Sequence, residues 1–230
     1  MTMARLLLAA VTTALLASTS AAAAVLVVRS SGPSAAAYPP GKALPDTHVL
    51  KLKPSDTVVL LDSRGTRTLQ GPGSYSVAAS ASSSGGAVRS AGTNARRVRL
   101  GAVRGAGARS VWQADLGQTG NVCIANPSEL TLYRAEAAGP ADIVLTDSDG
   151  KTANVHFDAD QWEASWPAGL AVKSGKRANV TGLGQPVTLT LRQLSPVPTG
   201  LEGMAQSLIR ANCQAQLDVL VETFTARTGG

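Results

Sequence analysis

The stretch TVVLLDSRGTRTLQ, residues 57–70, carries two runs of β-branched and aliphatic residues on either side of a polar segment at residues 62–65. Such runs favour extended backbone, and a polar segment that ends in Gly between them is typical of a hairpin turn. The stretch therefore predicts a β-hairpin. It also indicates the fold class, because much of the chain repeats this rhythm of short apolar runs and turn residues.

The residues before this hairpin extend the same pattern toward the N-terminus. KPSD at residues 53–56 is a turn, because its proline presets a backbone dihedral and Asp56 can bond its own backbone. HVLKL at residues 48–52 is a candidate strand, and VLVVR at residues 25–29 has the continuous apolar character of a short buried strand. Residues 25–77 are therefore expected to form a small N-terminal β unit.

A second set of strands and turns follows from residue 110 onward. PVTLTLRQL at residues 186–194 alternates aliphatic and polar side chains, which is the pattern of a half-buried strand. DSDG at residues 147–150 indicates another hairpin turn, and NVCIA at residues 121–125 an apolar strand. Several short strands joined by Gly, Pro and Asp turns predict a C-terminal unit that resembles a β-sandwich or partial barrel.

The end of the chain changes to a helical period. After a break at residues 195–200, apolar residues recur every three to four positions, the spacing of one helix face. They are Leu201, Ala205, Ile209, Cys213, Leu217, Leu220 and Phe224. This predicts one helix of about six turns, packed on the second β unit. The expected fold is mainly β: a small N-terminal β unit and, over residues 110–230, a β-sandwich-like unit with one C-terminal α-helix.

Residues 78–109 separate the two β units. Residues 78–94 are rich in Ser, Gly and Ala and bury too little apolar surface to offset ordering, so we expect a flexible linker. A basic cluster begins at its end and supplies much of the net charge of +6. It comprises Arg89, Arg96, Arg97, Arg99, Arg104 and Arg109. The cluster is either a solvated loop or exposed strand face, or a surface for anionic lipid or an acidic partner. Nucleic acid is not expected, because no aromatic residue accompanies these arginines to stack on bases.

Residues 1–24 follow the plan of a secretory signal peptide. Arg5 precedes an apolar run at residues 6–17, and small residues end the segment at residues 22–24. The apolar run is too short to span a bilayer, which takes about 20 residues. We expect cleavage after Ala24, no membrane span in the mature chain, and a periplasmic or secreted location.

The two cysteines, Cys123 and Cys213, are expected to form a disulfide. An exported chain reaches an oxidising compartment, where two cysteines tend to pair. Cys123 lies in an apolar strand and Cys213 on the apolar stripe of the C-terminal helix, so both are expected to face one core. Two separate buried thiols are the alternative, and a zinc site would lack further ligands.

Candidate catalytic groups are few. The chain has two histidines, His48 and His156, and no G-x-S-x-G motif, so no pair of nucleophile and base stands out. The glycines form neither a phosphate-binding loop nor a dinucleotide fingerprint. We therefore expect no enzyme activity and no cofactor.

An acidic run near His156 is where a cation could bind, since hard cations need several converging oxygens. The run comprises Asp142, Asp147, Asp149, Asp158 and Asp160. The DSDG segment lacks the third oxygen position and the terminal Glu of a calcium loop. An Asp-Gly hairpin turn explains the same residues, and no metal site is expected.

Three tryptophans, Trp112, Trp162 and Trp166, either line a ligand groove or pack in the core or rim of the β unit. In the groove alternative the chain is a cell-wall glycan binder or hydrolase, with Trp162 and Trp166 at the site. Asp158 or Asp160 would then serve as acid or base.

The segment LKPSDTVVLLDSRGTRTLQGPGSYSV, residues 52–77, resembles part of the periplasmic domain of FecR-type signalling proteins, whose spaced Gly, Asp and aliphatic residues build short consecutive strands. The second half, with NVCIANPSELTLYRAEA and WPAGL, is similar to the β-rich extension of some exported bacterial proteins that carry such a region. The resemblance implies a periplasmic binding or scaffold domain without catalytic residues. A signal-peptide pattern stands where FecR-type regulators have a cytoplasmic segment and a membrane span, so regulation of a sigma factor does not carry over.

Together these observations favour a non-catalytic exported protein that contacts another envelope protein. The contact surface is expected on the β units or on the basic segment after the linker. The candidate partner-binding residues are Arg96, Arg97, Arg99, Arg104, Trp162 and Trp166. A structural subunit of a surface assembly is a third alternative, which the sequence does not separate from the first.

Overall fold

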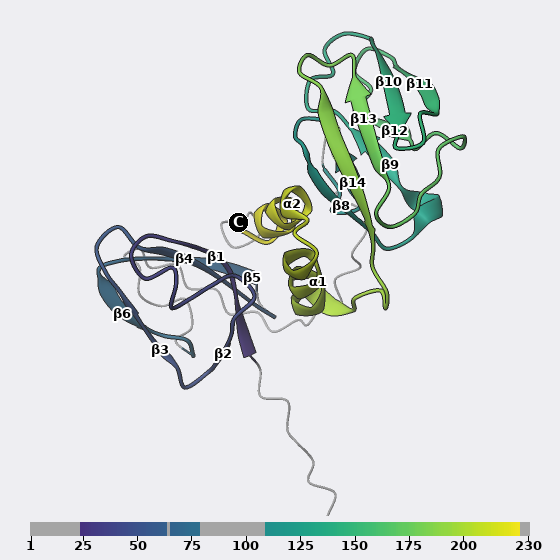
Figure 1. Cartoon of the computed structure of the whole chain (residues 1–230). Coiled ribbons are helices and arrows are strands. Elements are labelled where there is room, and N and C mark those ends of the chain that lie inside the picture. Colours follow the sequence, from purple (N-terminus) through teal and green to yellow (C-terminus); the bar gives the residue numbers. More distant parts are fainter. Residues whose placement is uncertain (1–23, 64, 79–108, 226–230) are drawn as a thin grey trace, which may run out of the picture.

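The structure is a computed structural model that describes residues 24–63, 65–78 and 109–225. Within them the chain is mainly β and ends in two helices, which confirms the predicted β-rich fold class. Figure 1 shows the two β units with the helix pair between them. The expected signal peptide lies outside the described residues except for Ala24, as does nearly all of the expected linker and basic segment at 78–109.

The N-terminal unit contains two small antiparallel sheets. Its strands are β1 (Ala24–Ser31), β2 (Ala43–Pro45), β3 (Val49–Leu52), β4 (Thr57–Asp62), β5 (Gly65–Gln70) and β6 (Gly73–Ser76). The larger sheet has the order β2-β1-β4-β5, and β3 pairs with β6. β4 and β5 form the predicted hairpin, with Asp62 opposite Gly65 at its turn.

The turn before β4 is held by the buried carboxylate of Asp56. It accepts hydrogen bonds from the backbone N–H groups of Ser34 (2.8 Å) and Lys53 (2.5 Å). Burial acts to raise the pKa of Asp56, but the bonds from Ser34 and Lys53 outweigh it and hold the pKa below its ordinary value. The predicted turn at residues 53–56 is confirmed, and its aspartate also anchors the loop after β1.

β1 and β4 are buried on both faces, which explains why their sequences are continuous apolar runs rather than alternating ones. Val25 and Val27 of β1 face a core inside the N-terminal unit. Leu26 and Val28 face the other way, into a cluster shared with the helices. The second face needs cover from outside the N-terminal unit.

The C-terminal unit packs a five-stranded sheet on a three-stranded one. Its strands are β7 (Gln113–Asp115), β8 (Gly120–Ile124), β9 (Thr131–Tyr133), β10 (Ala141–Asp147), β11 (Thr152–Phe157), β12 (Glu163–Ser165), β13 (Arg177–Thr181) and β14 (Val187–Gln193), and a short 3-10 helix spans Pro127–Glu129. The sheet orders are β11-β10-β13-β14-β8 and β12-β9-β7. Their inward faces share one core, with Leu132 from one sheet and Ile143 and Leu189 from the other.

The sequence patterns do not single out β13, although it lies between β10 and β14. This strand buries only Ala178 and Val180, while the other three residues of RANVT are exposed. Polar residues on the solvent face of a central strand give it the composition of a loop. The predicted hairpin at residues 147–150 and strand at 186–194 are confirmed as the β10–β11 turn and β14.

The helical stretch is divided into α1 (Gly200–Arg210) and α2 (Gln214–Thr225), so the prediction of one continuous helix is wrong. Asn212 has a φ of +53°, a left-handed conformation that Asn adopts more readily than most residues. Its N–H donates to the carbonyl of Ile209 (3.0 Å), and the N–H of Cys213 donates to that of Leu208 (2.9 Å). This pair of bonds is a Schellman cap, which ends α1 and turns the chain into α2.

The helix pair packs on both β units, whereas the sequence predicts packing on the second alone. Leu208 of α1 and Leu220 of α2 share one apolar cluster with Leu26 and Leu61 of the N-terminal sheet and with Cys123 of β8. The helices therefore supply the cover that the second face of β1 and β4 needs. No helix in the described part of the chain has the length and apolar character required to cross a membrane.

Candidate functional site

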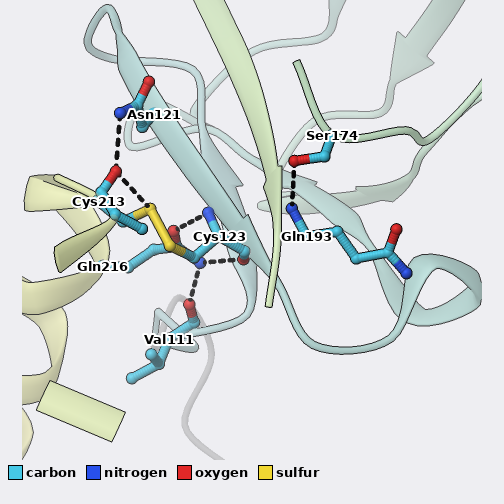
Figure 2. The surroundings of a disulfide bond; sticks show 8 residues. Val111, Asn121, Cys123, Ser174, Gln193, Cys213 and Gln216 are labelled. Carbon is cyan, nitrogen blue, oxygen red and sulfur yellow. Dashed lines mark hydrogen bonds between the residues drawn. A yellow bond between two sulfur atoms is a disulfide. The ribbon is translucent and has the colours of Figure 1, made fainter. Parts of the chain in front are cut away.

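The five-stranded sheet ends in two edge strands, β8 and β11, and the first is covered by the helix pair. The predicted disulfide between Cys123 of β8 and Cys213, just before α2, is present and closes a sequence separation of 90 residues (Figure 2). Asn121 of β8 adds a hydrogen bond from its side-chain amide to the carbonyl of Ala211 (2.8 Å). The disulfide and this bond fasten the α1–α2 junction to the edge of the sheet.

Gln216 of α2 covers the backbone of β8 beside the disulfide (Figure 2). Its Oε1 accepts from the Cys123 N–H (2.6 Å), and its Nε2 donates to the carbonyls of Cys123 (2.8 Å) and Val111 (2.6 Å). The buried amide thus satisfies a donor and an acceptor that an edge strand otherwise exposes. Sequence reasoning missed this residue, although a Gln three positions after Cys213 on an apolar helix face is a signal for such a bond.

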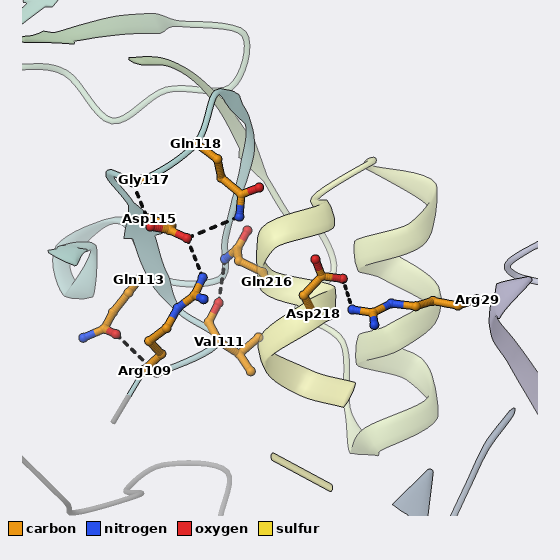
Figure 3. Close-up of polar contacts among 10 residues, drawn as sticks. Arg29, Arg109, Val111, Gln113, Asp115, Gly117, Gln118, Gln216 and Asp218 are labelled. Carbon is orange, nitrogen blue, oxygen red and sulfur yellow. Dashed lines mark hydrogen bonds and ion pairs between the residues drawn. The ribbon is translucent and has the colours of Figure 1, made fainter. Parts of the chain in front are cut away.

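Two ion pairs flank the junction (Figure 3). Arg29 of β1 pairs with Asp218 of α2. Arg109 donates to the Asp115 carboxylate (2.5 Å), and its guanidinium lies over the Tyr133 ring, 5.3 Å from the ring centroid. Arg109 is therefore engaged inside the protein. The remaining members of the predicted basic cluster lie outside the described residues; they are Arg89, Arg96, Arg97, Arg99 and Arg104.

The tryptophans of the glycan alternative do not form an exposed pair. Trp166 is 9% exposed and belongs to the core of the C-terminal unit, where its indole N–H donates to the carbonyl of Leu170 (3.0 Å). Trp162 is half-buried and lies four residues earlier, on the same side of the extended segment. Trp112 is partly buried against the helix cluster. These positions favour packing over a ligand groove.

A hollow of about 230 Å³ lies beside β8, between β14 and the start of α2. Side chains that line it include Asn121, Thr188, Thr190 and Gln214. No aromatic side chain is among the described residues that line it, so it offers no ring surface on which a sugar could stack.

The other edge strand, β11, has no strand beside it among the described residues. Its pairing with β10 is regular from Thr146 opposite Thr152 to Ala141 opposite Phe157. The N–H of Asp147 donates to the carbonyl of Lys151 (2.8 Å). Because hydrogen-bonded pairs alternate in an antiparallel ladder, this bond means that the odd-numbered residues of β11 bond to β10.

The even-numbered residues of β11 consequently direct their backbone N–H and C=O groups away from the sheet. They are Thr152, Asn154 and His156, and their side chains are all exposed. The odd-numbered residues Ala153 and Val155 are half-buried against the core of the C-terminal unit. β11 therefore presents backbone groups that no described strand pairs, beside the partly buried apolar side chains of Ala153 and Val155.

His156 lies between two carboxylates at the end of this edge. Its Nδ1 is 2.7 Å from Asp142 Oδ1 and its Nε2 is 3.5 Å from Asp158 Oδ1, while the carboxylate side chains are 85% and 84% exposed. The hydrogen bond to Asp142 raises the pKa of His156, desolvation lowers it, and the charges of Asp142 and Asp158 raise it further. The net effect is a pKa of His156 above its ordinary value, at an end of β11 that carries two exposed carboxylates.

The two histidines lie in different β units, and Asp147 of the acidic run belongs to a hairpin turn. His48 lies in the other β unit, where its ring is edge-on to Tyr38 at 6.2 Å, so the two histidines do not share a site. Within the described residues, no group of three His, Cys, Asp or Glu side chains is placed to hold a metal ion. The Asp147 carboxylate accepts from the backbone N–H groups of Asp149 (2.8 Å) and Lys151 (2.9 Å). These bonds fit the interpretation of residues 147–150 as a hairpin turn.

A buried arginine fixes the loop that follows β11. Arg134 donates to the carbonyls of Gln161 (2.8 Å) and Asp158 (2.7 Å), and its guanidinium lies 5.0 Å from the centroid of the Phe157 ring. Sequence reasoning missed this residue, because an arginine that follows a short apolar run ordinarily indicates a solvent-facing position. Arg134 thus ties the loop that carries Asp158 to the segment that follows β9.

Comparison of the chain with family models, with curated proteins and with solved structures finds no match.

Proposed function

We propose that the chain is an exported, non-catalytic binding or scaffold protein that contacts another protein of the cell envelope through its C-terminal β unit. The observation that carries this proposal is the open edge of β11 in a molecule whose other described edges are short or covered. An exposed edge strand invites pairing with another chain, and natural proteins ordinarily block it.

The other edges show how such blocking is achieved here. β2, β7 and β12 have three residues each, and β3 and β6 have four, which leaves few backbone groups to pair. The start of β5, at Gly65 and Thr66, is buried beside α2, where the hydroxyl of Thr66 donates to the carbonyl of Val221 (3.5 Å). β8 is covered by Gln216 and the disulfide. β11, with six residues, is left open among the described strands.

Export is supported by two observations that are independent of this edge. Residues 1–24 have the plan of a signal peptide, and the Cys123–Cys213 disulfide suits an oxidising compartment. The proposed mature chain starts at Val25, which keeps β1 from its second residue.

Site-specific photo-crosslinking in envelope extracts tests the binding proposal. A photoreactive residue at Asn154, on the open edge, is expected to capture a discrete protein partner. The same residue at Arg210, which is exposed on α1, serves as the matched control. A chain with Arg96, Arg97 and Arg99 changed to Ala separates the basic segment from the β unit, because capture from Asn154 is expected to persist. Capture from neither position, with or without these arginines, would contradict the proposal.

A further inference from the structure

We infer that β11 receives an extended, basic segment of the partner as a sixth strand of the five-stranded sheet. The inference rests on the proposed function, since it names the attachment site and chemistry of the proposed envelope partner. It is an instance of strand addition, in which backbone hydrogen bonds provide affinity and alternate side chains provide specificity.

The backbone of β11 is prepared for this pairing. Thr152, Asn154 and His156 direct their N–H and C=O groups outward, and the strand has no bulge along its pairing with β10. TANVHF contains neither proline nor lysine, the residues that commonly protect an edge. The covered edge strand β8 differs in that the amide of Gln216 already bonds the N–H and C=O of Cys123.

The inward side of the edge favours aliphatic residues at alternate positions of the added strand. Ala153 and Val155 of β11 and Ala164 of β12 are only partly buried, and all three pack against the core of the C-terminal unit. An added strand would place every second side chain over this margin. Small or β-branched aliphatic residues there would extend the existing core.

The outward side favours a positive charge. Asp142 and Asp158 flank His156 with exposed carboxylates. A lysine or arginine on the outer face of the added strand would meet these carboxylates. The whole chain carries a formal charge of +6, so its overall electrostatic field would repel a basic segment. A preference for basic peptides would therefore report the local acidic edge.

The test uses the mature chain from Val25 to Gly230 and two fluorescent ten-residue peptides, one alternating Val with Lys and the other alternating Val with Glu. Binding is measured by fluorescence anisotropy at physiological salt. The Lys peptide is expected to bind at least about tenfold more tightly than the Glu peptide. Asn154→Pro removes an outward N–H and leaves the bonds to β10. It is expected to weaken binding of the Lys peptide by about tenfold or more.

Asn154→Thr is the matched control, since it keeps the N–H and is expected to bind within about twofold of the original chain. If Asn154→Pro melts early, the pair Asp142→Asn and Asp158→Asn tests the charge instead and should remove the preference for Lys. Equal binding to Asn154→Pro and the original chain, or binding of neither peptide, would overturn the inference. So would a dimer that dissociates in Asn154→Pro, because a second copy would then occupy the edge.

The proposed function and the inference fail separately. A partner captured by crosslinking from positions other than Asn154, and retained by Asn154→Pro, would support a binding protein while rejecting strand addition at β11.

Discussion

The two edge strands of the five-stranded sheet differ in how their outward backbone groups are covered. At β8, a disulfide and the amide of Gln216 close the edge with the helix pair. At β11, the corresponding backbone groups of Thr152, Asn154 and His156 have no strand beside them among the described residues. The same sheet is therefore closed at one edge by covalent and polar contacts, while its other edge keeps outward backbone groups that no described strand pairs.

The largest expected effect comes from opening the covered edge. Changing Cys123 and Cys213 together to Ala removes a link over 90 residues, for which the chain-entropy model gives about 4 to 5 kcal/mol of unfolding free energy. Urea unfolding measures the loss. Thiol titration of the unreduced, denatured original chain should find no free cysteine, and a reducing agent should not further destabilise the double variant. Two titratable thiols in exported material would contradict the pairing.

A proline scan of β11 tests which of its backbone N–H groups bond to β10 and which point outward. Ala153→Pro is expected to cost about 3 kcal/mol, because it removes a bond to β10. Asn154→Pro is expected to cost less than about 1 kcal/mol, because its N–H points outward. Thermal melts of both variants decide the order, and the reverse order would mean that the alternation along β11 is shifted by one residue.

Removing the amide that covers β8 tests the polar part of the closure. Gln216→Leu leaves the N–H and C=O of Cys123 without their partner, which is expected to cost about 2 kcal/mol. Gln214→Leu is the matched control on the same helix, because Gln214 is exposed and donates to Asp218 (2.8 Å). Similar losses in the two variants would show that Gln216 adds nothing beyond helix packing.

The smallest effect is at the acidic end of β11. Since the pKa of His156 is raised in the folded chain, its protonation stabilises the fold below the unfolded pKa, and this contribution is lost as the pH rises through the folded pKa. The group is exposed, so the change in stability is slight. NMR titration should show that Asp142→Asn lowers the pKa of His156. An unchanged pKa would remove Asp142 as its main cause.

Local patterns predicted the hairpins and the mainly β fold because each depends on neighbouring residues or on one clear period. The disulfide was predictable although it joins residues 90 apart, because the chain has only two cysteines. The break at Asn212 escaped prediction because the apolar stripe continues through it from Ile209 to Leu217. Both helices pack in the same cluster, so the stripe keeps its period while the axis turns. Asn212 does not by itself indicate a Schellman cap, because its left-handed backbone conformation cannot be read from the sequence.

The site was harder to predict than the fold. An open edge is a property of sheet order, and β11 becomes an edge only once β13 takes its place on the other side of β10. The alternation in TANVHF indicates a strand but not its neighbours. Likewise, Trp166 becomes a core residue through the hydrogen bond to Leu170 and the closure of two sheets. Non-local pairing therefore limits what one sequence reveals about binding surfaces.

Amide hydrogen exchange, followed residue by residue by NMR, tests the contrast between the two edges most directly. The N–H groups of Thr152, Asn154 and His156 should exchange rapidly, while those of Ala153 and Val155 are protected by β10. The N–H of Cys123 should be protected although β8 ends the sheet, because it donates to Gln216 (2.6 Å). Protection of Asn154 equal to that of Ala153, or rapid exchange at Cys123, would contradict the account of one closed and one open edge.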